Sequence, residues 1–304
     1  IEQAWLDLQA RAAGVTLARQ LGGCYRQAVP VYANINRGIP AARSPQAFAS
    51  QARLAVADGY RAIKIAPFDG VHWQSDAAAH RPSLRDIGIE RVLAVRDAIG
   101  SDVRLLIDCH GRFDAVGASV VIDALAAAQP FWLEDILDPV FRGDDGRSIR
   151  QQAHRHGIRV AGGEELAELG DFLALLETAS TDVVLPDLRL TGIRAGMIIC
   201  EVAAARGQQV SLHNPVGPVL DAVSRHVAAA LPNFLILERP VRESPIWEAL
   251  GVSNAGLIDG DATLEAEAGL GVDLGSDYLR SAGEAGFLPG RVSYRGLPGA
   301  GPDA

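Results

Sequence analysis

The chain has few cysteines and no long apolar run, and both features limit the classes of protein to which it can belong. Its 304 residues include three cysteines, Cys24, Cys109 and Cys200, with no Cys-x-x-Cys pair and no spacing typical of a disulfide framework. This usage fits a reducing compartment, so we expect a cytoplasmic protein. Even the apolar segment Ala115–Gln129 contains a charge, at Asp123, and is too short to cross a bilayer. We therefore expect no contact with membranes.

An excess of positive charge is also missing. The chain carries 28 Lys and Arg against 37 Asp and Glu, a formal net charge of −9, and it has no basic run. This balance argues against nucleic-acid binding. It leaves room for an anionic substrate, because a bound metal ion supplies local positive charge. The sequence also lacks a P-loop, a Gly-x-Ser-x-Gly elbow and a dinucleotide fingerprint. It opens at Ile1 without a starting Met, so we expect the natural N-terminus to lie upstream.

Short β-rich runs alternate with helix-period stretches along most of the chain. The runs are Val29–Ile35, Ala62–Phe68, Arg104–His110, Phe131–Asp135, Arg159–Glu164, Asp182–Leu188, Gln209–Asn214 and Phe234–Arg239. Near-continuous apolar strands alternating with helices predict a parallel sheet covered by helices. Eight such strands favour a closed α/β barrel of the TIM-like (β/α)8 type. A doubly wound open sheet would need a Gly-rich phosphate turn after the first strand, and Ile35–Pro40 has none.

Three segments follow from this pattern. Residues 1–23 are predicted as a helix that leads into the barrel and ends at Gly22-Gly23. Residues 24–240 form the barrel. The segment 241–304 is expected to be irregular, with a disordered end. The stretch Pro67–Arg85 is long for a βα loop, and the sequence leaves open whether it is an active-site lid or a variable surface insertion.

Ionisable residues stand at the end of every predicted strand from the second to the eighth. In chain order they are Lys64, then Asp108 and His110, then Glu134, Glu164, Asp187, His213 and Glu238. Active sites of such barrels lie at the carboxyl ends of the strands. The residues are therefore expected to meet at one mouth of the barrel.

The acids on the third, fourth and fifth strands predict a metal site. Buried like charges repel unless something neutralises them, and an all-oxygen set of carboxylates suits Mg²⁺. Asp108, Glu134 and Glu164 are the expected ligands. Asp135 and Glu165 follow two of these ligands directly, so strand alternation predicts that they point away or into loops, and both are interpreted as structural.

The strands on either side of the acids offer proton-transfer groups. Asp187 is expected to hydrogen-bond and orient His213 as a general base. Strand alternation points His110 into the barrel mouth beside Asp108. Lys64 reads either as a cation near a substrate carboxylate or as a partner of the acids.

Weaker candidates complete the set. Glu238 is expected either to contact the substrate or to form a salt bridge with an arginine. Asn34 is a weaker candidate for substrate contact and is read mainly as structural. The remaining histidines lie outside this pattern and are expected to have no functional role: His154 and His156 diverge on a helix, and His72, His80 and His226 are expected at the surface.

The order of these motifs resembles the barrel of the enolase superfamily, in its mandelate racemase and muconate-lactonising branch. The matching stretches are Leu106–Arg112, Phe131–Asp135, Ala161–Glu164, Pro186-Asp187 with Gly192, and His213-Asn214-Pro215 with Gly217-Pro218. The Asp-x-His-Gly-Arg run is most similar to acid-sugar dehydratases of the galactonate and mannonate type. The resemblance implies a modified (β/α)7β barrel, with a segment after the barrel that returns to an N-terminal α+β capping domain.

Two departures from the branch limit what the resemblance implies. The branch often carries Lys-x-Lys on the second strand, with the second lysine as a base, whereas this chain has Lys64-Ile65-Ala66. That disfavours lactonisation or racemisation through such a lysine. The capping domain is absent from the sequence.

The resemblance therefore implies a Mg²⁺-dependent dehydratase of a sugar acid, acting as a homo-oligomer. His213 would abstract the proton next to the carboxylate, and His110 would protonate the departing 3-hydroxyl, giving a 2-keto-3-deoxy acid. The alternatives are a racemase or epimerase of a 2-hydroxy acid and a non-catalytic, metal-binding barrel. The sequence does not identify the sugar.

Overall fold

The structure is a computed structural model that describes residues 1–74, 84–141, 143–242, 256–273 and 275. His80, the middle of the stretch Pro67–Arg85 and most of the segment 241–304 lie outside the described residues. No described helix is both long and apolar enough to cross a membrane.

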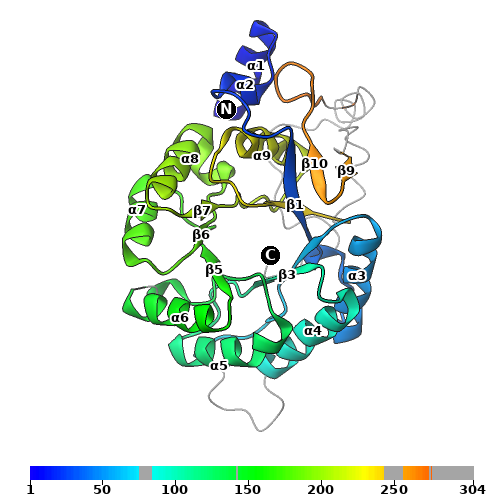
Figure 1. Cartoon of the computed structure of the whole chain (residues 1–304), viewed down its shortest axis with the longest axis vertical. Coiled ribbons are helices and arrows are strands. Elements are labelled where there is room, and N and C mark those ends of the chain that lie inside the picture. The colour runs from blue at the N-terminus through cyan, green and yellow to red at the C-terminus, as the bar shows by residue number, and fades with distance from the viewer. Residues whose placement is uncertain (75–83, 142, 243–255, 274, 276–304) are drawn as a thin grey trace, which may run out of the picture.

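Eight of the ten strands found in the described residues form a parallel barrel (Figure 1). They are β1 (Ala28–Asn34), β2 (Ala62–Ile65), β3 (Arg104–Asp108), β4 (Trp132–Glu134), β5 (Arg159–Gly162), β6 (Val183–Val184), β7 (Gln209–Val210) and β8 (Leu237–Pro240). Neighbours along the chain pair in order from β1 to β7, and β8 returns to pair with β1. A bridge between Val210 and Phe234 joins β7 to the approach of β8 and closes the ring. Each of these eight strands overlaps a run predicted from the sequence, and β1 and β8 each extend one residue beyond theirs.

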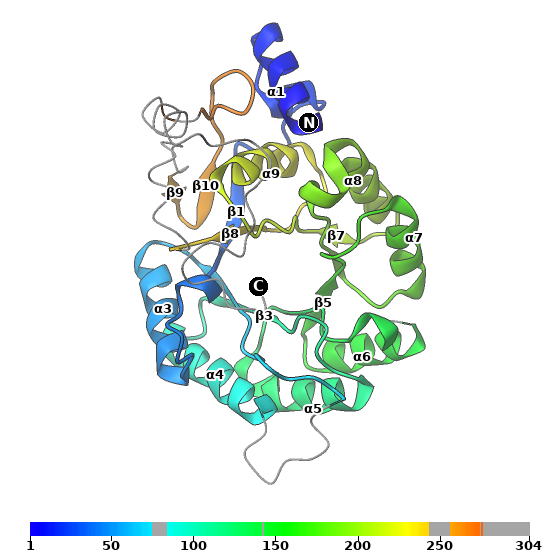
Figure 2. The same ribbon diagram turned by 180° about the vertical axis from the view of Figure 1, so that it is seen from behind.

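Helices surround the barrel on the outside, as Figures 1 and 2 show from opposite sides. They are α3 (Pro45–Ala57), α4 (Leu84–Ile99), α5 (Ala115–Leu125), α6 (Asp144–Arg155), α7 (Leu169–Thr178), α8 (Leu188–Ala205) and α9 (Pro218–Ala230). Local signals start several of them: the side chains of Ser44 and Asp114 cap α3 and α5, and Pro218 opens α9. The described residues thus contain seven βα units followed by β8, which confirms the expected (β/α)7β arrangement.

Alternate strand positions fill the inside of the barrel. One apolar cluster consists of Tyr32, Ala62, Leu106, Trp132, Ala161, Val183, Leu185 and Ile236. The rings of Tyr32 and Trp132 meet edge to face with centroids 5.5 Å apart. A second, larger cluster lies between the strands and the helices. The barrel interior is therefore a packed floor and not a channel.

The N-terminal segment differs from its prediction in one respect. It forms two helices, α1 (Glu2–Ala13) and α2 (Leu17–Gln20), and not one helix ending at Gly22-Gly23. Gly14 ends α1 with a left-handed φ of 68°, a conformation in which a Cβ would be strained. The chain can then turn, so that α2 packs against α9 while α1 extends away from the ring (Figure 1).

The segment after the barrel is not wholly irregular, so that expectation was wrong for its described part. Strands β9 (Leu257–Ile258) and β10 (Asp261–Thr263) form a hairpin, and β10 pairs antiparallel with β1. The hairpin turns at Asp259-Gly260, both with positive φ, which suits a tight two-residue turn. The pairing covers the part of β1 that extends beyond the barrel.

The expected surface position of His226 is also wrong. His226 lies on α9 and is fully buried. Its Nδ1 accepts a hydrogen bond from the backbone N–H of Ala18 at 3.4 Å, and its Nε2 lies 3.2 Å from the carbonyl oxygen of Leu270. Every residue of α9 from Leu220 onward is buried, because α2 and the segment near Leu270 cover the face that would otherwise meet solvent. The imidazole thus joins both flanking segments to the barrel.

This geometry predicts a stability that depends on pH. Burial lowers the pKa of His226, and a proton on Nδ1 would face the Ala18 N–H. Below about pH 6.5 the unfolded chain therefore binds more protons than the fold, and stability falls as the pH falls. His226→Gln, which keeps an acceptor and a donor but does not titrate, should lose less of its free energy of unfolding between pH 7.5 and pH 5.5, measured by urea denaturation. His154→Gln, an exposed variant on α6, is the control, and equal losses in wild type and His226→Gln would contradict the role.

Candidate active site and metal centre

The polar side chains above the apolar floor of the barrel are placed there by the two-residue period of the strands. A strand side chain two positions after an inward one also points inward. Thus Asn34, Lys64, Asp108, Glu134, Asp187 and Glu238 follow Tyr32, Ala62, Leu106, Trp132, Leu185 and Ile236, which all belong to the floor. The predicted site residues therefore do meet at one barrel mouth.

Glu164 reaches the same mouth by a different route. The inward position on β5 after Ala161 would be residue 163, which is a glycine with φ of 106°. A Cβ there would lie 3.0 Å from Leu175. Gly163 therefore bends the chain at the end of β5, and the next residue, Glu164, turns toward the site.

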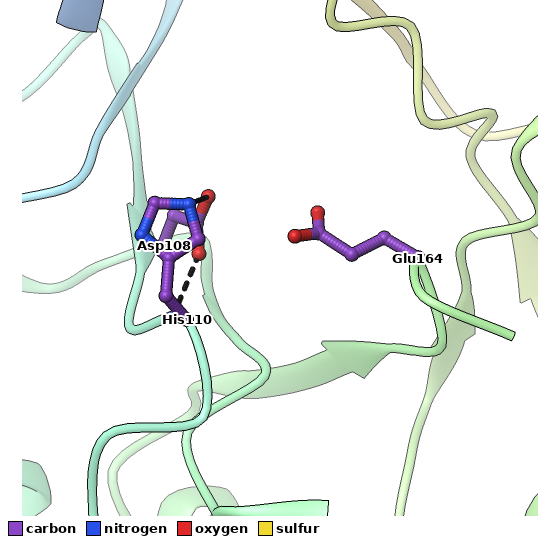
Figure 3. Close-up of side chains that lie close together, drawn as sticks. All are labelled: Asp108, His110 and Glu164. Atoms are coloured by element: carbon purple, nitrogen blue, oxygen red, sulfur yellow. Dashed lines mark hydrogen bonds and ion pairs between the residues drawn. The ribbon is translucent and has the colours of Figure 1, made fainter. Parts of the chain in front are cut away.

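Asp108, His110 and Glu164 form the group within the described residues that could hold a metal ion, each offering one ligand atom within 4.8 Å of the others. Figure 3 shows Asp108 and His110 together at the end of β3, with the carboxylate of Glu164 pointing toward them from across the site. His110 Nε2 lies 3.1 Å from Asp108 Oδ2. The backbone N–H of His110 donates to Asp108 Oδ1 at 3.0 Å.

Glu134, the remaining expected ligand, lies outside this group. Its Cα is level with that of Ala161 on β5, so Glu164 stands three residues further along. Its Oε1 accepts a 2.6 Å hydrogen bond from Lys64 Nζ, and its Oε2 accepts one from Trp132 Nε1 at 3.0 Å. Glu134 therefore sits deeper than Glu164, close to the floor.

Lys64 serves as the buried cation of this acid cluster. Its Nζ lies 2.6 Å from Glu134, 3.1 Å from Glu238 and 3.7 Å from Asp108. Burial acts to lower the pKa of Lys64, but Glu134 and Glu238 outweigh it and raise that pKa well above the usual value. The sequence left two roles open for Lys64, and its contacts in the structure are those of a partner of the acids.

One ammonium does not neutralise the cluster. Burial raises the pKa of Glu134 to about 7, despite Lys64 beside it. Burial and the charges of Asp108 and Glu134 raise the pKa of Glu164 well above its usual value. Glu164 Oε2 is buried and has no hydrogen-bond partner in the described part of the chain. A carboxylate so placed lacks a cation, so the residues present fit a divalent metal.

His213 and Asp187 form the hydrogen bond expected from the sequence. Nδ1 of His213 lies 3.0 Å from Asp187 Oδ2, and a parallel bridge beyond the ends of β6 and β7 joins the two residues. Since a carboxylate only accepts, Nδ1 donates, and in the neutral imidazole Nε2 then carries the lone pair. Nε2 lies 3.2 Å from Glu164 Oε2. Burial opposes ionisation of Asp187, but His213 and Arg189 outweigh burial and lower the pKa of Asp187.

Glu238 pairs with Lys64 and not with an arginine. Its Oε1 also accepts from Asn34 Nδ2 at 2.6 Å, and its Oε2 accepts from the backbone N–H of Asn214 at 3.1 Å. Asn34 thus supports Glu238. Sequence reasoning missed Asn214, whose Nδ2 also donates to the carbonyl oxygen of Glu238 at 2.8 Å. Its place directly after His213, at a strand end, was the available signal.

The residues just past the strands do not follow the strand period. Asp135 and Glu165, expected to point away or into loops, line a cavity of about 300 Å³ with His110 and Glu164. Asp135 and His110 have φ of 37° and 49°, so each begins a turn and the two-residue period ends before it. His110 reaches Asp108 through this turn and not as an inward strand residue.

Comparison with known proteins gives the family. The family model of the enolase C-terminal domain-like proteins matches residues 47–278. The D-gluconate dehydratase of Thermoproteus tenax is 34% identical over 249 residues, which are 82% of this chain and 48% of that protein. The D-xylonate dehydratase of Haloferax volcanii is 30% identical over 92% of this chain and 68% of its own length.

The fold agrees with these sequence matches. A crystal structure of a mandelate racemase/muconate lactonizing enzyme from Jannaschia sp. CCS1 superposes with a TM-score of 0.74 and 27% identity, over 91% of this chain and 71% of that one. The chain spans about half the length of the gluconate dehydratase that it matches. It belongs to the enolase C-terminal domain-like family.

Proposed function

We propose that the protein is a Mg²⁺-dependent dehydratase of a sugar acid that removes the proton next to the carboxylate and eliminates the 3-hydroxyl, giving a 2-keto-3-deoxy acid. One observation carries the proposal: an imidazole oriented by a carboxylate points its lone pair at an under-neutralised acid cluster. The relatives named for gluconate and xylonate dehydration support the substrate class.

Asp108, Glu134 and Glu164 would hold the Mg²⁺, since that ion prefers oxygen ligands. Bound there, it would supply the positive charge that stabilises negative charge building up on the substrate carboxylate. Glu134 would exchange part of its contact with Lys64 for the ion. This leaves His110 uncoordinated and available for proton transfer.

His213 is the proposed base. Asp187 holds its Nδ1–H at 3.0 Å and stabilises the imidazolium that forms when Nε2 takes the proton. Arg189 also binds Asp187, which keeps that carboxylate ionised and in place. Nε2 faces Glu164, so a substrate held beside the acids lies within its reach.

His110 is the proposed acid. Asp108 raises the pKa of His110, so the imidazole is held in its protonated form more than a free histidine would be. A protonated imidazole beside the metal ligands can donate to a departing hydroxyl, which is a poor leaving group without a proton. Lys64 and Glu238 lie next to the acids. Lys64 is proposed as a cation near the substrate carboxylate, and Glu238 as a polar contact to the substrate, with Asn34 supporting Glu238.

The metal proposal predicts opposite effects of Glu164→Gln with and without Mg²⁺. In EDTA the variant should melt at a higher temperature than wild type, because one of the repelling carboxylates is gone. In millimolar Mg²⁺ wild type should gain stability by mass action, and the variant should gain little. Differential scanning fluorimetry measures both, with the exposed Glu201→Gln as control. A wild-type melting temperature that is the same with and without Mg²⁺ would contradict the metal assignment.

The same titration separates the two possible donor sets. If Glu134 is a ligand and His110 is not, Glu134→Gln should weaken Mg²⁺ binding by more than the roughly 10–100-fold that loss of an outer partner costs. His110→Asn should then change the affinity little. Isothermal titration calorimetry on both variants decides, and the reverse pattern would assign His110 to the metal.

Isotope exchange predicts separate roles for the two histidines. His213→Asn should lose dehydration and also exchange of the substrate α-hydrogen in D₂O, by a factor on the order of 10²–10⁴. His110→Asn should lose dehydration by a similar factor yet keep exchange, since base and metal remain. Proton NMR with D-gluconate, D-xylonate and D-galactonate follows both, and exposed His154→Asn is the control.

Two exchange patterns would change the assignment. Exchange that survives in His213→Asn and vanishes in His110→Asn would reverse the roles. A racemase would give a different pattern. Each single variant would then lose turnover of one substrate enantiomer but keep α-hydrogen exchange with the other enantiomer.

The exposed end of α1 supports a homo-oligomer. Ile1, Trp5 and Leu8 are all more than half exposed there, and apolar residues grouped in this way favour an interface. Sedimentation should show species larger than a monomer that shrink in Trp5→Ser, with Val140→Ser as a matched change at an exposed apolar residue elsewhere. A soluble wild-type monomer would contradict the proposal.

A further inference from the structure

The cavity beside the metal ligands extends away from the base, to a part of the barrel that the proposed chemistry does not use. Its volume is about 300 Å³, which is the size of a small-ligand site. Glu164 and His110 line its inner end, and Arg112, Asp138 and Glu165 line it further out. A substrate whose carboxylate is held by the acid cluster has room for the rest of its chain here.

The outer wall of the cavity is held rigidly. Beyond the strand ends the loops after β3 and β4 continue to pair: Gly111 N–H donates to the carbonyl oxygen of Asp135 at 2.6 Å, and Asp138 N–H to that of Phe113 at 2.9 Å. A bridge between Phe113 and Leu137 lies between these bonds. The backbones at Arg112 and Asp138 are therefore fixed relative to each other before any ligand binds, which lowers the cost of binding.

Arg112 has hydrogen-bond donors to spare. A guanidinium carries five N–H donors. In the described part of the chain its one hydrogen-bond acceptor is the carbonyl oxygen of Val71, at 3.3 Å from Nη1. No carboxylate of the described residues pairs with it.

Asp138 has acceptor capacity to spare. It accepts from Trp73 Nε1 at 3.3 Å and from the backbone N–H of Val140 at 3.0 Å. An ionised carboxylate has about four lone-pair sites, so about two remain. The wall thus offers both donors and acceptors, as hydroxyl groups require.

The charge of the lining excludes a second anion. Four carboxylates, those of Asp135, Asp138, Glu164 and Glu165, line the same cavity, against the guanidinium of Arg112 and the imidazoles of His72 and His110. A neutral polyol is compatible with this lining, whereas a distal carboxylate or phosphate would be repelled.

We propose that Arg112 and Asp138 bind the distal hydroxyl groups of the substrate and restrict it to an unphosphorylated sugar acid with one carboxylate and a chain of at least five carbons. This rests on the proposed dehydratase function. Arg112 donates to the distal oxygens, and Asp138 accepts from their hydroxyl hydrogens while repelling a second anion.

A chain-length series tests the role of Arg112. The probes are glycerate, threonate, D-xylonate and D-gluconate, with kcat/KM measured in Mg²⁺ and Kd measured by calorimetry. Loss of a hydrogen bond from a charged donor weakens binding about 10–100-fold. Arg112→Met should show that loss for xylonate and gluconate and none for glycerate. Arg112→Lys, which keeps one donor group, should fall between, and exposed Arg194→Met on α8 should match wild type.

Anion discrimination tests the role of Asp138. Wild type should prefer D-gluconate to D-glucarate and to 6-phosphogluconate by at least about tenfold. Asp138→Asn keeps an acceptor for Trp73 but removes the charge, so its preference should shrink by about tenfold. Melting curves check that each variant is folded.

The outcomes are separable. Wild type that neither binds nor converts any acid of the series overturns the proposed function and this inference with it. Wild-type turnover with losses in Arg112→Met that are equal at every chain length overturns this inference alone. So does a wild type that accepts the diacid as well as the monoacid.

Discussion

The crowding of negative charge at the barrel mouth is the constraint on which the site depends. Asp108, Glu134, Glu164, Asp187 and Glu238 are all buried there, and Lys64 is the ammonium buried among them. A group of this kind is costly to desolvate, and mutual repulsion raises the cost further. The raised pKa values of Glu134 and Glu164 express this cost directly. A fold maintains such strain at a functional site when a ligand relieves it.

The rest of the barrel is arranged to hold these charges in place. Trp132, in the floor, donates to Glu134, and the floor ring of Tyr32 lies 5.5 Å from the Lys64 ammonium. Behind Glu238, the side chain of Asn214 donates to Asp221, which in turn binds the buried guanidinium of Arg225. Glu134 and Glu238 are therefore fixed by neighbours that are themselves packed or hydrogen-bonded.

Much of this was predictable because a strand repeats every two residues. Once the eight strands were placed, the same period put Asp108, Glu134, Asp187 and Glu238 at one mouth. The period ends where a strand stops, so it does not place the residues that follow. Asp135 starts a turn with positive φ and lines the cavity. Glu164 was placed correctly, but through the glycine before it and not through alternation.

Long-range packing was the other part that the sequence could not supply. Nothing local distinguishes His226 from a surface histidine on an amphipathic helix, because its burial depends on segments about 40 residues later and over 200 residues earlier. The hairpin of β9 and β10 was hidden for a similar reason. Its strands are two and three residues long, and pairing with β1 stabilises them more than their own sequence does.

The barrel mouth divides into two halves that meet at Glu164. On one side, β6, β7 and β8 carry the hydrogen-bonded Asp187 and His213 together with Glu238. On the other, β3 and β4 carry Asp108 with His110, and their extended loops bear the cavity wall. Glu164 is within 3.2 Å of His213 Nε2 and within 4.8 Å of the ligand atoms of Asp108 and His110. A molecule bound at Glu164 would therefore meet one histidine from each side.

Such an arrangement suits a reaction that removes a proton at one carbon and assists departure of a hydroxyl at the next carbon, because the two steps need their catalytic groups next to different atoms. It also explains why the cavity lies on the His110 side. Atoms beyond the departing hydroxyl must extend in that direction, away from the base.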